Sequence, residues 1–241
     1  MRYALISDIH GNLQALKAVL NALENHQVHQ YLCLGDIVGY GANPEECVEL
    51  VRSLTDKTVA GNHDYAAVGL TDISHFNPYA REAVLWTAKH LSEESKQYLR
   101  DLPLLLKAGP FTLVHSTPES PELWNYIFSP QDALAAFSYF EGSICFVAHS
   151  HRPMTFIQGP RGLQWDFSDQ VQIHFGSRYI INPGSVGQPR DGDPRACFAI
   201  YDTEASEVRI LRAKYDLPGA QAAIRAAGLP EILAERLQYG E

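Results

Sequence analysis

The first half of the chain alternates short apolar runs with helical patterns, and no other feature of the sequence restricts the fold as strongly. Residues 3–7 are expected to form a buried strand, and leucines then recur at helical spacing over 13–23. Further short strands are expected at 31–34, 58–60, 111–114 and 144–148. Strands that alternate with helices predict βαβ units and a largely parallel sheet, so the expected fold class is α/β.

Three further helices are expected to begin where a polar capping residue precedes a proline, because proline is favoured at the first helical position. The pairs are Asn43-Pro44, Asn77-Pro78 and Ser129-Pro130. The second half of the chain has a different character, since turn residues separate its apolar runs at 154–157, 171–174, 179–181, 196–201 and 207–211. These runs predict antiparallel strands in a mixed or second sheet. Two short helices are expected near 220–227 and 231–237, and we expect residues 1–241 to form a single domain.

Composition excludes several classes of protein. The chain has 241 residues with 19 Lys+Arg against 28 Asp+Glu, a net charge of −9, which argues against extended nucleic-acid binding on a broad basic face. The four cysteines form no CxxC pair, so neither a zinc ribbon nor a thioredoxin-type motif is expected, and free thiols are typical of a reducing compartment. The first apolar run is too short for a signal peptide, and no apolar stretch is long enough to cross a membrane. We therefore expect a soluble, cytoplasmic protein.

Polar side chains with ligand chemistry follow five of the apolar runs. The segments are Asp8-Ile9-His10, Gly35-Asp36, Gly61-Asn62-His63-Asp64, His115 and His149-Ser150-His151. Because the carboxyl ends of strands in open α/β sheets meet at one crevice, these side chains are expected to converge. Residues two apart in an extended chain point to the same side, so each spaced pair can direct two ligands at one point. The glycines that precede ligands allow the backbone to approach closely.

This convergence predicts a metal site. Two carboxylates and four imidazoles in one crevice would repel one another or lose solvation unless a cation were bound. Imidazole with carboxylate suits Zn, Fe, Ni and Mn, and the ligands are too many for one tetrahedral ion. Two ions about 3.5–4 Å apart, bridged by a carboxylate, would use the whole set. Two divalent cations would outweigh the charges of Asp8 and Asp36, so the crevice would attract phosphate.

As an ordered set, these motifs resemble the calcineurin-like metallophosphoesterase superfamily, and the likeness runs from Asp8 to about Arg195. Three longer strings are similar to its small, single-domain prokaryotic phosphodiesterase branch. They are Asp8-Ile9-His10-Gly11-Asn12, Gly35-Asp36-Ile37-Val38-Gly39-Tyr40-Gly41 and Asn182-Pro183-Gly184-Ser185-Val186-Gly187-Gln188-Pro189-Arg190.

The resemblance implies a four-layer α/β-β-α sandwich with two mixed sheets flanked by helices. It implies two divalent metal ions, with Asp36 as the bridging ligand. One ion would be held by Asp8, His10, Asp36 and His151, and the other by Asp36, Asn62, His115 and His149. His63 would be the general acid rather than a ligand.

Two positions depart from related patterns. The superfamily usually has glycine before the paired histidines, whereas this chain has Ala148, whose methyl group is expected to crowd the second ion. The purple acid phosphatases have a ligand tyrosine three residues after the bridging aspartate, whereas this chain has Gly39 there. Tyr40 comes one residue later and is expected on the other side of an extended segment, which excludes that relative.

These parts predict a metal-dependent phosphoric ester hydrolase, most simply a phosphodiesterase acting on a small phosphodiester or nucleotide. Hydroxide shared by the two ions would attack phosphorus, and His63 would give a proton to the leaving oxygen. Asp64 would either orient His63 or begin a helix. Arg152 and Arg190 are candidate substrate-binding residues, as is Asn12 if it does not cap the first helix. Residues 182–190 are expected to support the metal ligands from behind.

Several alternatives stay open at this stage. A protein phosphatase or a phosphomonoesterase would share the same core motifs. A non-catalytic scaffold, like the retromer subunit with this fold, would also keep much of the pocket. A nuclease of the superfamily would carry an added capping domain, and the net charge opposes it. The sequence leaves the substrate, the native metals and the oligomeric state undetermined.

Overall fold

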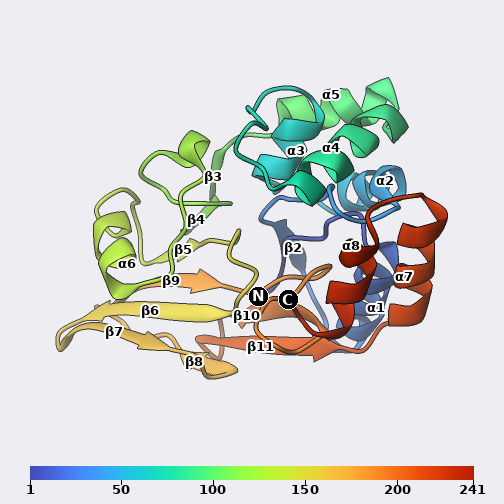
Figure 1. The fold of residues 1–241 in the computed structure, drawn as a ribbon. Helices are drawn as coiled ribbons and strands as arrows, with labels where there is room; N and C mark the ends of the chain where they lie inside the picture. Colours follow the sequence, from blue (N-terminus) through green and yellow to red (C-terminus); the bar gives the residue numbers. More distant parts are fainter.

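Two β-sheets lie face to face in the computed structural model, which describes residues 1–241, and helices cover their outer faces (Figure 1). The first sheet has the strand order β2-β1-β10-β11-β8. Its strands are β1 (Arg2–Ile6), β2 (Gln30–Cys33), β8 (Gln170–Gln172), β10 (Ala196–Asp202) and β11 (Glu207–Ala213). Only β1 and β2 are parallel, whereas the other neighbours are antiparallel. The site described below lies at the carboxyl ends of β1 and β2.

The second sheet has the order β3-β4-β5-β9-β6-β7. Its strands are β3 (Leu105–Ala108), β4 (Phe111–Val114), β5 (Ile144–Phe146), β6 (Met154–Gly159), β7 (Gly162–Asp166) and β9 (Arg178–Asn182). The central strands β4, β5 and β9 are parallel, and antiparallel hairpins flank them on both sides. Buried side chains from both sheets, such as Leu5 and Phe146, form the core between them.

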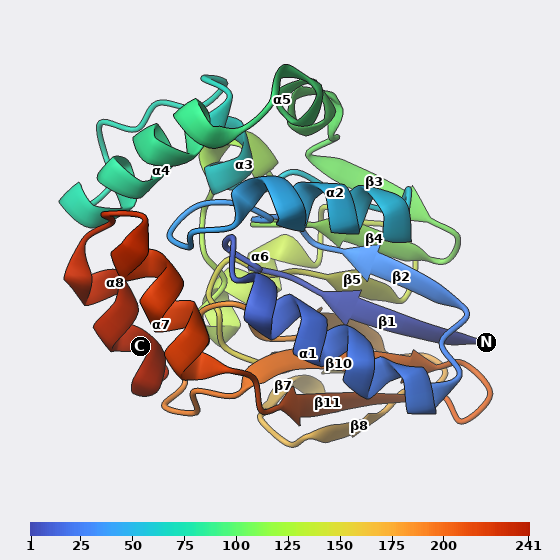
Figure 2. The same cartoon turned by 90° about the vertical axis from the view of Figure 1, so that its right-hand side faces the viewer.

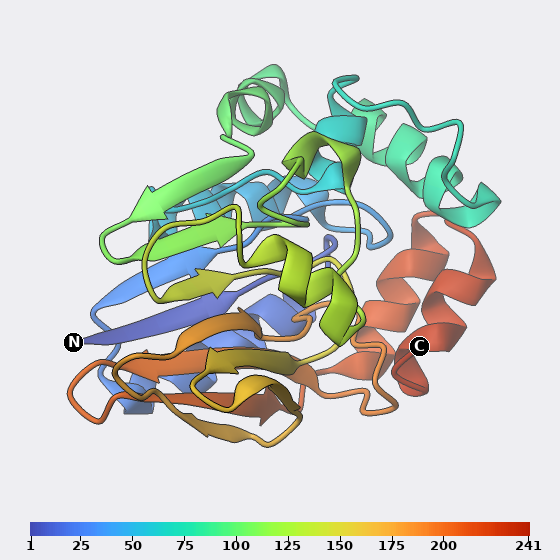
Figure 3. The ribbon, with the colours of Figure 1, turned by 90° about the vertical axis from the view of Figure 1, so that its left-hand side faces the viewer.

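The first sheet is covered by α1 (Leu13–Leu23) and α2 (Pro44–Leu54), and Figure 2 shows both in front of it. The second sheet is covered by α6 (Pro130–Ala136), which Figure 3 shows from the opposite side. Beyond one end of the sheets lie α3 (Asn62–Ala67), α4 (Pro78–His90) and α5 (Glu93–Asp101). Next to them, α7 (Leu217–Ala226) and α8 (Glu231–Glu235) pack with α4 around Tyr40. Single 3-10 turns occur at Glu24–His26, Pro121–Leu123 and Arg236–Gln238.

The expected α/β fold with two mixed sheets flanked by helices is confirmed. The three proline-marked helices also begin where expected, although only Asn77 and Ser129 accept a capping hydrogen bond. None of the helices is long and apolar enough to cross a membrane.

Two expectations about the strands are wrong. Residues 58–60 form no strand, because only Thr58 pairs with Cys33 before Ala60 donates to the carbonyl of Pro103 and the chain enters α3. The strands of the first half also do not share one largely parallel sheet. Instead β1 pairs with the antiparallel strand β10 in the first sheet, and β5 pairs with the parallel strand β9 in the second. The polar helix α5 and the short strands β3 and β7 were not expected.

Candidate metal centre

The side chains singled out in the sequence meet where four strands end. Asp8 and His10 follow β1, Asp36 follows β2, His115 follows β4, and the pair at 149 and 151 follows β5. Asn62 and His63 form the first turn of α3, which begins directly at the site. All of these side chains are buried, with at most 7% of any of them exposed. The expected convergence of distant segments is therefore observed.

The backbone brings these donors together by a route that the sequence did not indicate. Asp8, His10, Asp36, His149 and His151 all have positive φ, between 49° and 68°. The spaced pairs are therefore not extended, and their side chains converge because the chain turns at each donor. Left-handed backbone costs about 1–2 kcal/mol for a residue with a Cβ atom. Hydrogen bonds between the loops hold it in place, including Asp8 N–H to the Gly35 carbonyl and His10 N–H to that of Asp36, each 3.0 Å long.

Two glycines permit the loops to touch, as expected. A Cβ atom on Gly61 would lie 2.1 Å from Asp36 Oδ1, and one on Gly35 would lie 2.5 Å from the Gly61 nitrogen. Side chains at these positions would separate the loops that carry Asp36 and Asn62. The close approach also lets the His63 backbone N–H donate to Asp36 Oδ1 at 2.8 Å, which leaves Oδ2 of that carboxylate free.

A first group of donors gathers around the free oxygens of two carboxylates. It consists of Asp8, His10, Asp36 and His151, whose ligand atoms all lie within 4.8 Å of one another. His10 Nε2 is 3.6 Å from Asp36 Oδ2, and His151 Nε2 is 3.4 Å from Asp8 Oδ1. The two imidazoles bring their Nε2 atoms to 3.1 Å from each other.

A second group shares Asp36 with the first and adds His115 and His149. His115 Nε2 is 3.4 Å from Asp36 Oδ2 and 3.2 Å from His149 Nδ1. Asn62 lines the same cavity as Asp36 and His149, and its Oδ1 atom is buried without a partner. Because Asp36 belongs to both groups, its carboxylate is placed to bridge two ions.

The four histidines of the two groups have a common arrangement. Each directs one ring nitrogen into the site and the other at a backbone carbonyl. The outer contacts are His10 Nδ1 to Val38 (3.0 Å), His115 Nδ1 to Leu34 (2.7 Å), His151 Nδ1 to Gln188 (2.6 Å) and His149 Nε2 to Trp124 (2.9 Å). Since a carbonyl only accepts hydrogen bonds, a neutral ring carries its proton on the outer nitrogen and presents a lone pair on the inner one. Burial opposes protonation of His115, but Asp36 and Asp8 outweigh it and raise its pKa to about 9, so this ring would give up its inner proton to take a cation.

The inner surface of the site therefore consists of acceptors with few donors. Asp8 Oδ1, Asp36 Oδ2 and Asn62 Oδ1 are buried without a hydrogen-bond partner. Burial raises the pKa of the Asp8 carboxyl to about 7. Burial acts in the same direction on Asp36, but His115 and His63 outweigh it and hold the pKa of that carboxyl well below its usual range. Imidazole and carboxylate ligand atoms gathered with so few hydrogen-bond donors fit divalent transition-metal ions.

His63 lies beside the donor groups without belonging to either. Its ring contacts those of Tyr40 and Phe76, with centroid distances of 4.5 and 4.9 Å, and its Nδ1 atom is buried without a partner. Asp64 makes no hydrogen bond to it. Instead the Asp64 carboxylate accepts from the backbone N–H groups of Ile37, Val38 and Gly61, at 2.8–3.1 Å. Of the two roles considered for Asp64, the structure supports the helix start and not the orientation of His63.

Asn12 also has a structural position. Its Oδ1 atom caps α1 by accepting from Ala15 N–H at 3.0 Å, and its amide donates to the Gly187 carbonyl at 2.9 Å. Of the two roles considered for Asn12, the structure shows the helix cap, and Asn12 does not line the main cavity. The Asn12 side-chain oxygen thus accepts from a backbone N–H group that has no partner within the first turn of the helix.

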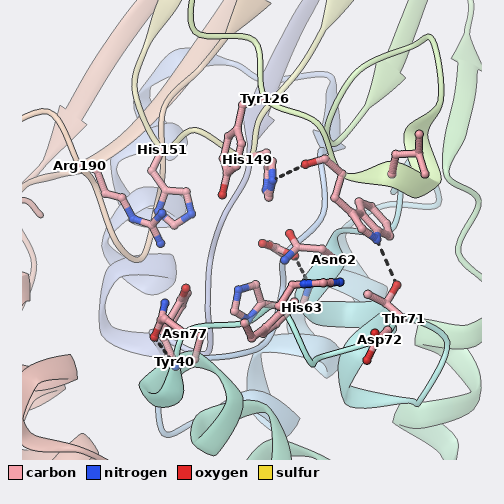
Figure 4. Close-up of a pocket in the computed structure, with 16 residues that line it drawn as sticks. Tyr40, Asn62, His63, Thr71, Asp72, Asn77, Tyr126, His149, His151 and Arg190 are labelled. Carbon is pink, nitrogen blue, oxygen red and sulfur yellow. Dashed lines mark hydrogen bonds between the residues drawn. The ribbon is translucent and has the colours of Figure 1, made fainter.

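The segment from 182 to 190 supports the donors from behind, as expected. The Gln188 carbonyl accepts from His151, and Ser185 Oγ donates to the Asp8 carbonyl at 2.8 Å. The segment ends at Arg190, which lies beside His151 (Figure 4). Arg152 is exposed, and its Nε–H donates to the Arg190 carbonyl at 2.7 Å.

Ala148 does not crowd the second donor group. Its methyl group packs into the core between the sheets, and the next residue still places its inner nitrogen 3.2 Å from His115. The departure from the usual glycine is tolerated because Ala148 itself does not have positive φ.

A cavity of about 310 Å³ opens from the donor groups toward solvent. Sequence reasoning missed most of its walls, which include Tyr40, Phe76, Trp124 and Tyr126 (Figure 4). The Tyr126 ring stacks on His149 at a centroid distance of 3.9 Å. Tyr40 was expected to point away, but its positive φ turns the ring onto His63. The irregular segment from 115 to 129 carries no pattern that would place its aromatic residues at a site.

Comparisons with known proteins agree with this geometry. The family model for the calcineurin-like phosphoesterase superfamily domain matches residues 1–206. The chain is 43% identical to the uncharacterized protein MJ0912 of Methanocaldococcus jannaschii, over 98% of this chain and 97% of that protein. A metallophosphoesterase from Sphaerobacter thermophilus is 44% identical, with a TM-score of 0.89 over 100% of this chain and 99% of that one. The hypothetical protein PH1004 of Pyrococcus horikoshii shares the fold at 22% identity, with a TM-score of 0.80 over 100% and 98% of the two chains.

Proposed function

The chain belongs to the calcineurin-like phosphoesterase superfamily and is thus a phosphoric ester hydrolase with a buried His/Asp metal site, and from this premise we propose that it hydrolyses small phosphodiesters. The observation that carries the proposal is the acceptor-rich interior of the site. Inner imidazole nitrogens face two carboxylate oxygens that have no hydrogen-bond partner. Such a cluster is suited to hold cations whose charge attracts phosphate.

The two donor groups suggest how each ion would be held. Asp8, His10, Asp36 and His151 would bind one ion, and Asp36, Asn62, His115 and His149 would bind the other. Mn, Fe, Zn and Ni all accept this donor set. When bound, a pair of divalent ions lowers the pKa of a water molecule and neutralises charge on the phosphate.

His63 is proposed as the general acid. In hydrolysis, water adds to phosphorus, the bond to the leaving oxygen breaks, and that oxygen takes a proton. Burial lowers the pKa of His63 to about 4 in the substrate-free protein, so its ring is neutral there at pH 7. An anionic phosphate beside the ring favours the protonated form, so His63 would take up its proton as substrate binds.

The shape of the site favours a diester over a monoester. On one side of the donor groups the cavity continues past His63 to Phe76 and Asn77. On the other side it reaches Arg190, which also lines a second hollow. A phosphate held at the donors would therefore have room for a substituent on each side, and only a diester has two.

The test is a substrate panel with protein that has been stripped by a chelator and reloaded with Mn²⁺, Fe²⁺, Zn²⁺ or Ni²⁺. We expect bis-p-nitrophenyl phosphate to be hydrolysed faster than p-nitrophenyl phosphate, with no turnover in chelator and recovery on adding Mn²⁺. Faster turnover of the monoester would favour the phosphomonoesterase or protein phosphatase alternative. Activity that persisted in chelator would overturn the proposed mechanism.

We also propose that residues 1–241 act as one unit in a reducing cytoplasm. Tyr40 packs against both α7 and α8, so the C-terminal helices help to form the site. All four cysteines are buried and unpaired. The net charge of −9 supports a small substrate rather than extended nucleic acid.

A further inference from the structure

A second hollow of about 1160 Å³ adjoins the substrate cavity on the side of His151. The two share Tyr126 and Arg190 as lining residues, so they lie next to each other on either side of these side chains. Arg152 lines the second hollow only. The Arg152 Nε–H group donates to the Arg190 backbone carbonyl, so the Arg152 side chain lies against the Arg190 backbone. The Arg190 guanidinium lies 5.7 Å from the Tyr40 ring centroid, on the side of the first cavity.

These two arginines keep hydrogen-bond donors free. Arg190 directs Nε and Nη2 at the neutral Gln188 Oε1, at 3.2 and 2.7 Å, and its Nη1 has no partner. Arg152 uses only Nε, so both of its Nη groups are free. Neither has a carboxylate within 4.0 Å. Arg178 shows the contrast, because its Nε, Nη1 and Nη2 atoms all donate to backbone carbonyls and serve structure.

The outer part of the hollow has the opposite character. Its arginines are neutralised, since Arg212 pairs with Asp191 and Arg195 pairs with Asp193. Two further carboxylates, Asp169 and Glu241, also line it. The free positive charge is therefore confined to the inner end, and the acidic rim opposes a long polyanion.

Resting on the proposed function, we propose that the part of the substrate retained after cleavage carries a second phosphate group, which Arg152 and Arg190 bind. Guanidinium groups bind phosphate through paired N–H donors, and here the unpaired charges stand beside the donors that would hold the reacting phosphate. The acidic rim limits the ligand to one further phosphate rather than a chain of them. The substrate class is thus a small phosphodiester with a neighbouring phosphomonoester.

A matched pair of chromogenic substrates tests this. Both are p-nitrophenyl esters of thymidine 5′-phosphate, and one carries an additional 3′-phosphate. The leaving group is the same, so any difference in kcat/KM arises from the second phosphate. A third ester with a 3′-succinyl group distinguishes phosphate from a carboxylate. We expect the wild-type protein to prefer the 3′-phosphorylated ester by about 10-fold or more, the effect of a charge-assisted hydrogen bond.

The variant Arg152→Gln removes the charge at an exposed position, and Arg161→Gln removes an exposed arginine in the turn between β6 and β7 as the matched control. We expect Arg152→Gln to bring the ratio of the two kcat/KM values toward one, and Arg161→Gln to keep the wild-type ratio. Equal kcat/KM for the two phosphate esters in the wild type would overturn the inference while leaving the proposed function intact. An equal preference for the succinyl ester would overturn the assignment to phosphate. Hydrolysis of none of the esters would overturn the proposed function and the inference with it.

Discussion

Replacing Gly61 by alanine tests whether the position of Asp36 determines metal binding. The backbone of Gly61, with φ −100° and ψ 170°, accepts any residue, so the substitution acts only through the space that its methyl group needs. That Cβ atom would lie 2.1 Å from Asp36 Oδ1, 2.4 Å from Asp36 N and 2.6 Å from Asp36 Cγ. Even to reach the tight limit of 3.0 Å, the Asp36 loop must move by about 0.9 Å, and an ordinary contact of 3.4 Å needs about 1.3 Å. Metal–ligand distances tolerate about 0.2 Å, so we expect Gly61→Ala to lose both ions.

The assays are elemental analysis and thermal unfolding of the same preparation. Overpacking costs about 1–3 kcal/mol, and each kcal/mol lowers Tm by about 2–4 °C in a protein of this size, so the variant stays folded at room temperature. Gly159→Ala is the control, because its Cβ atom would meet only the movable Ser177 Oγ, at 3.0 Å, far from the site. Two ions per chain and unchanged turnover in Gly61→Ala would refute the proposal that Asp36 bridges them.

Three further outcomes are expected. Asp36→Asn should bind neither ion, because both groups share this carboxylate, and elemental analysis that found two ions per chain would contradict the assignment. His63→Gln should fold and bind metal but cleave diesters with alkyl leaving groups about 10²–10⁴-fold more slowly, with a smaller loss for p-nitrophenyl esters, and equal losses on both would remove the acid role. Arg2 and the N–H groups of residues 204 and 205 hold the pKa of Asp202 at about 2 rather than 3.8. This stabilisation is complete above pH 3.8 and disappears as the pH falls through 2. In urea titrations of chelator-treated protein, the free energy of unfolding of the wild type should therefore exceed that of Asp202→Asn above pH 3.8, and the difference should vanish as the pH falls toward 2.

The ligand positions could be predicted because they depend on a general property of sheets. Apolar runs identify strands, and the residues that follow the parallel strands lie at the crevice. Asn62 is the exception, because it begins α3 after residues that form no strand. The division of the strands between two sheets could not be read in this way. It depends on whether β1 pairs with β10, a contact between residues about 200 positions apart, and no local pattern records that pairing.

The directions of single side chains around the cavity could not be predicted from the sequence either. Whether Asp64 faces His63 or the backbone N–H groups of the neighbouring loop depends on how closely two loops pack. The same is true of Tyr40, whose ring reaches His63 only because of its left-handed backbone. Composition and spacing fix neither feature, since the same residues in extended loops would point elsewhere.

The left-handed backbone at five of the seven proposed metal donors has a consequence for how the ions bind. The loops are ordered when the chain folds, so capture of an ion requires little further loss of conformational freedom. Such preorganisation raises affinity, because the free energy of coordination is not spent on arranging the ligands. The same ordering would keep the ligand atoms, which lie within 4.8 Å of one another in each group, close together after the ions are removed.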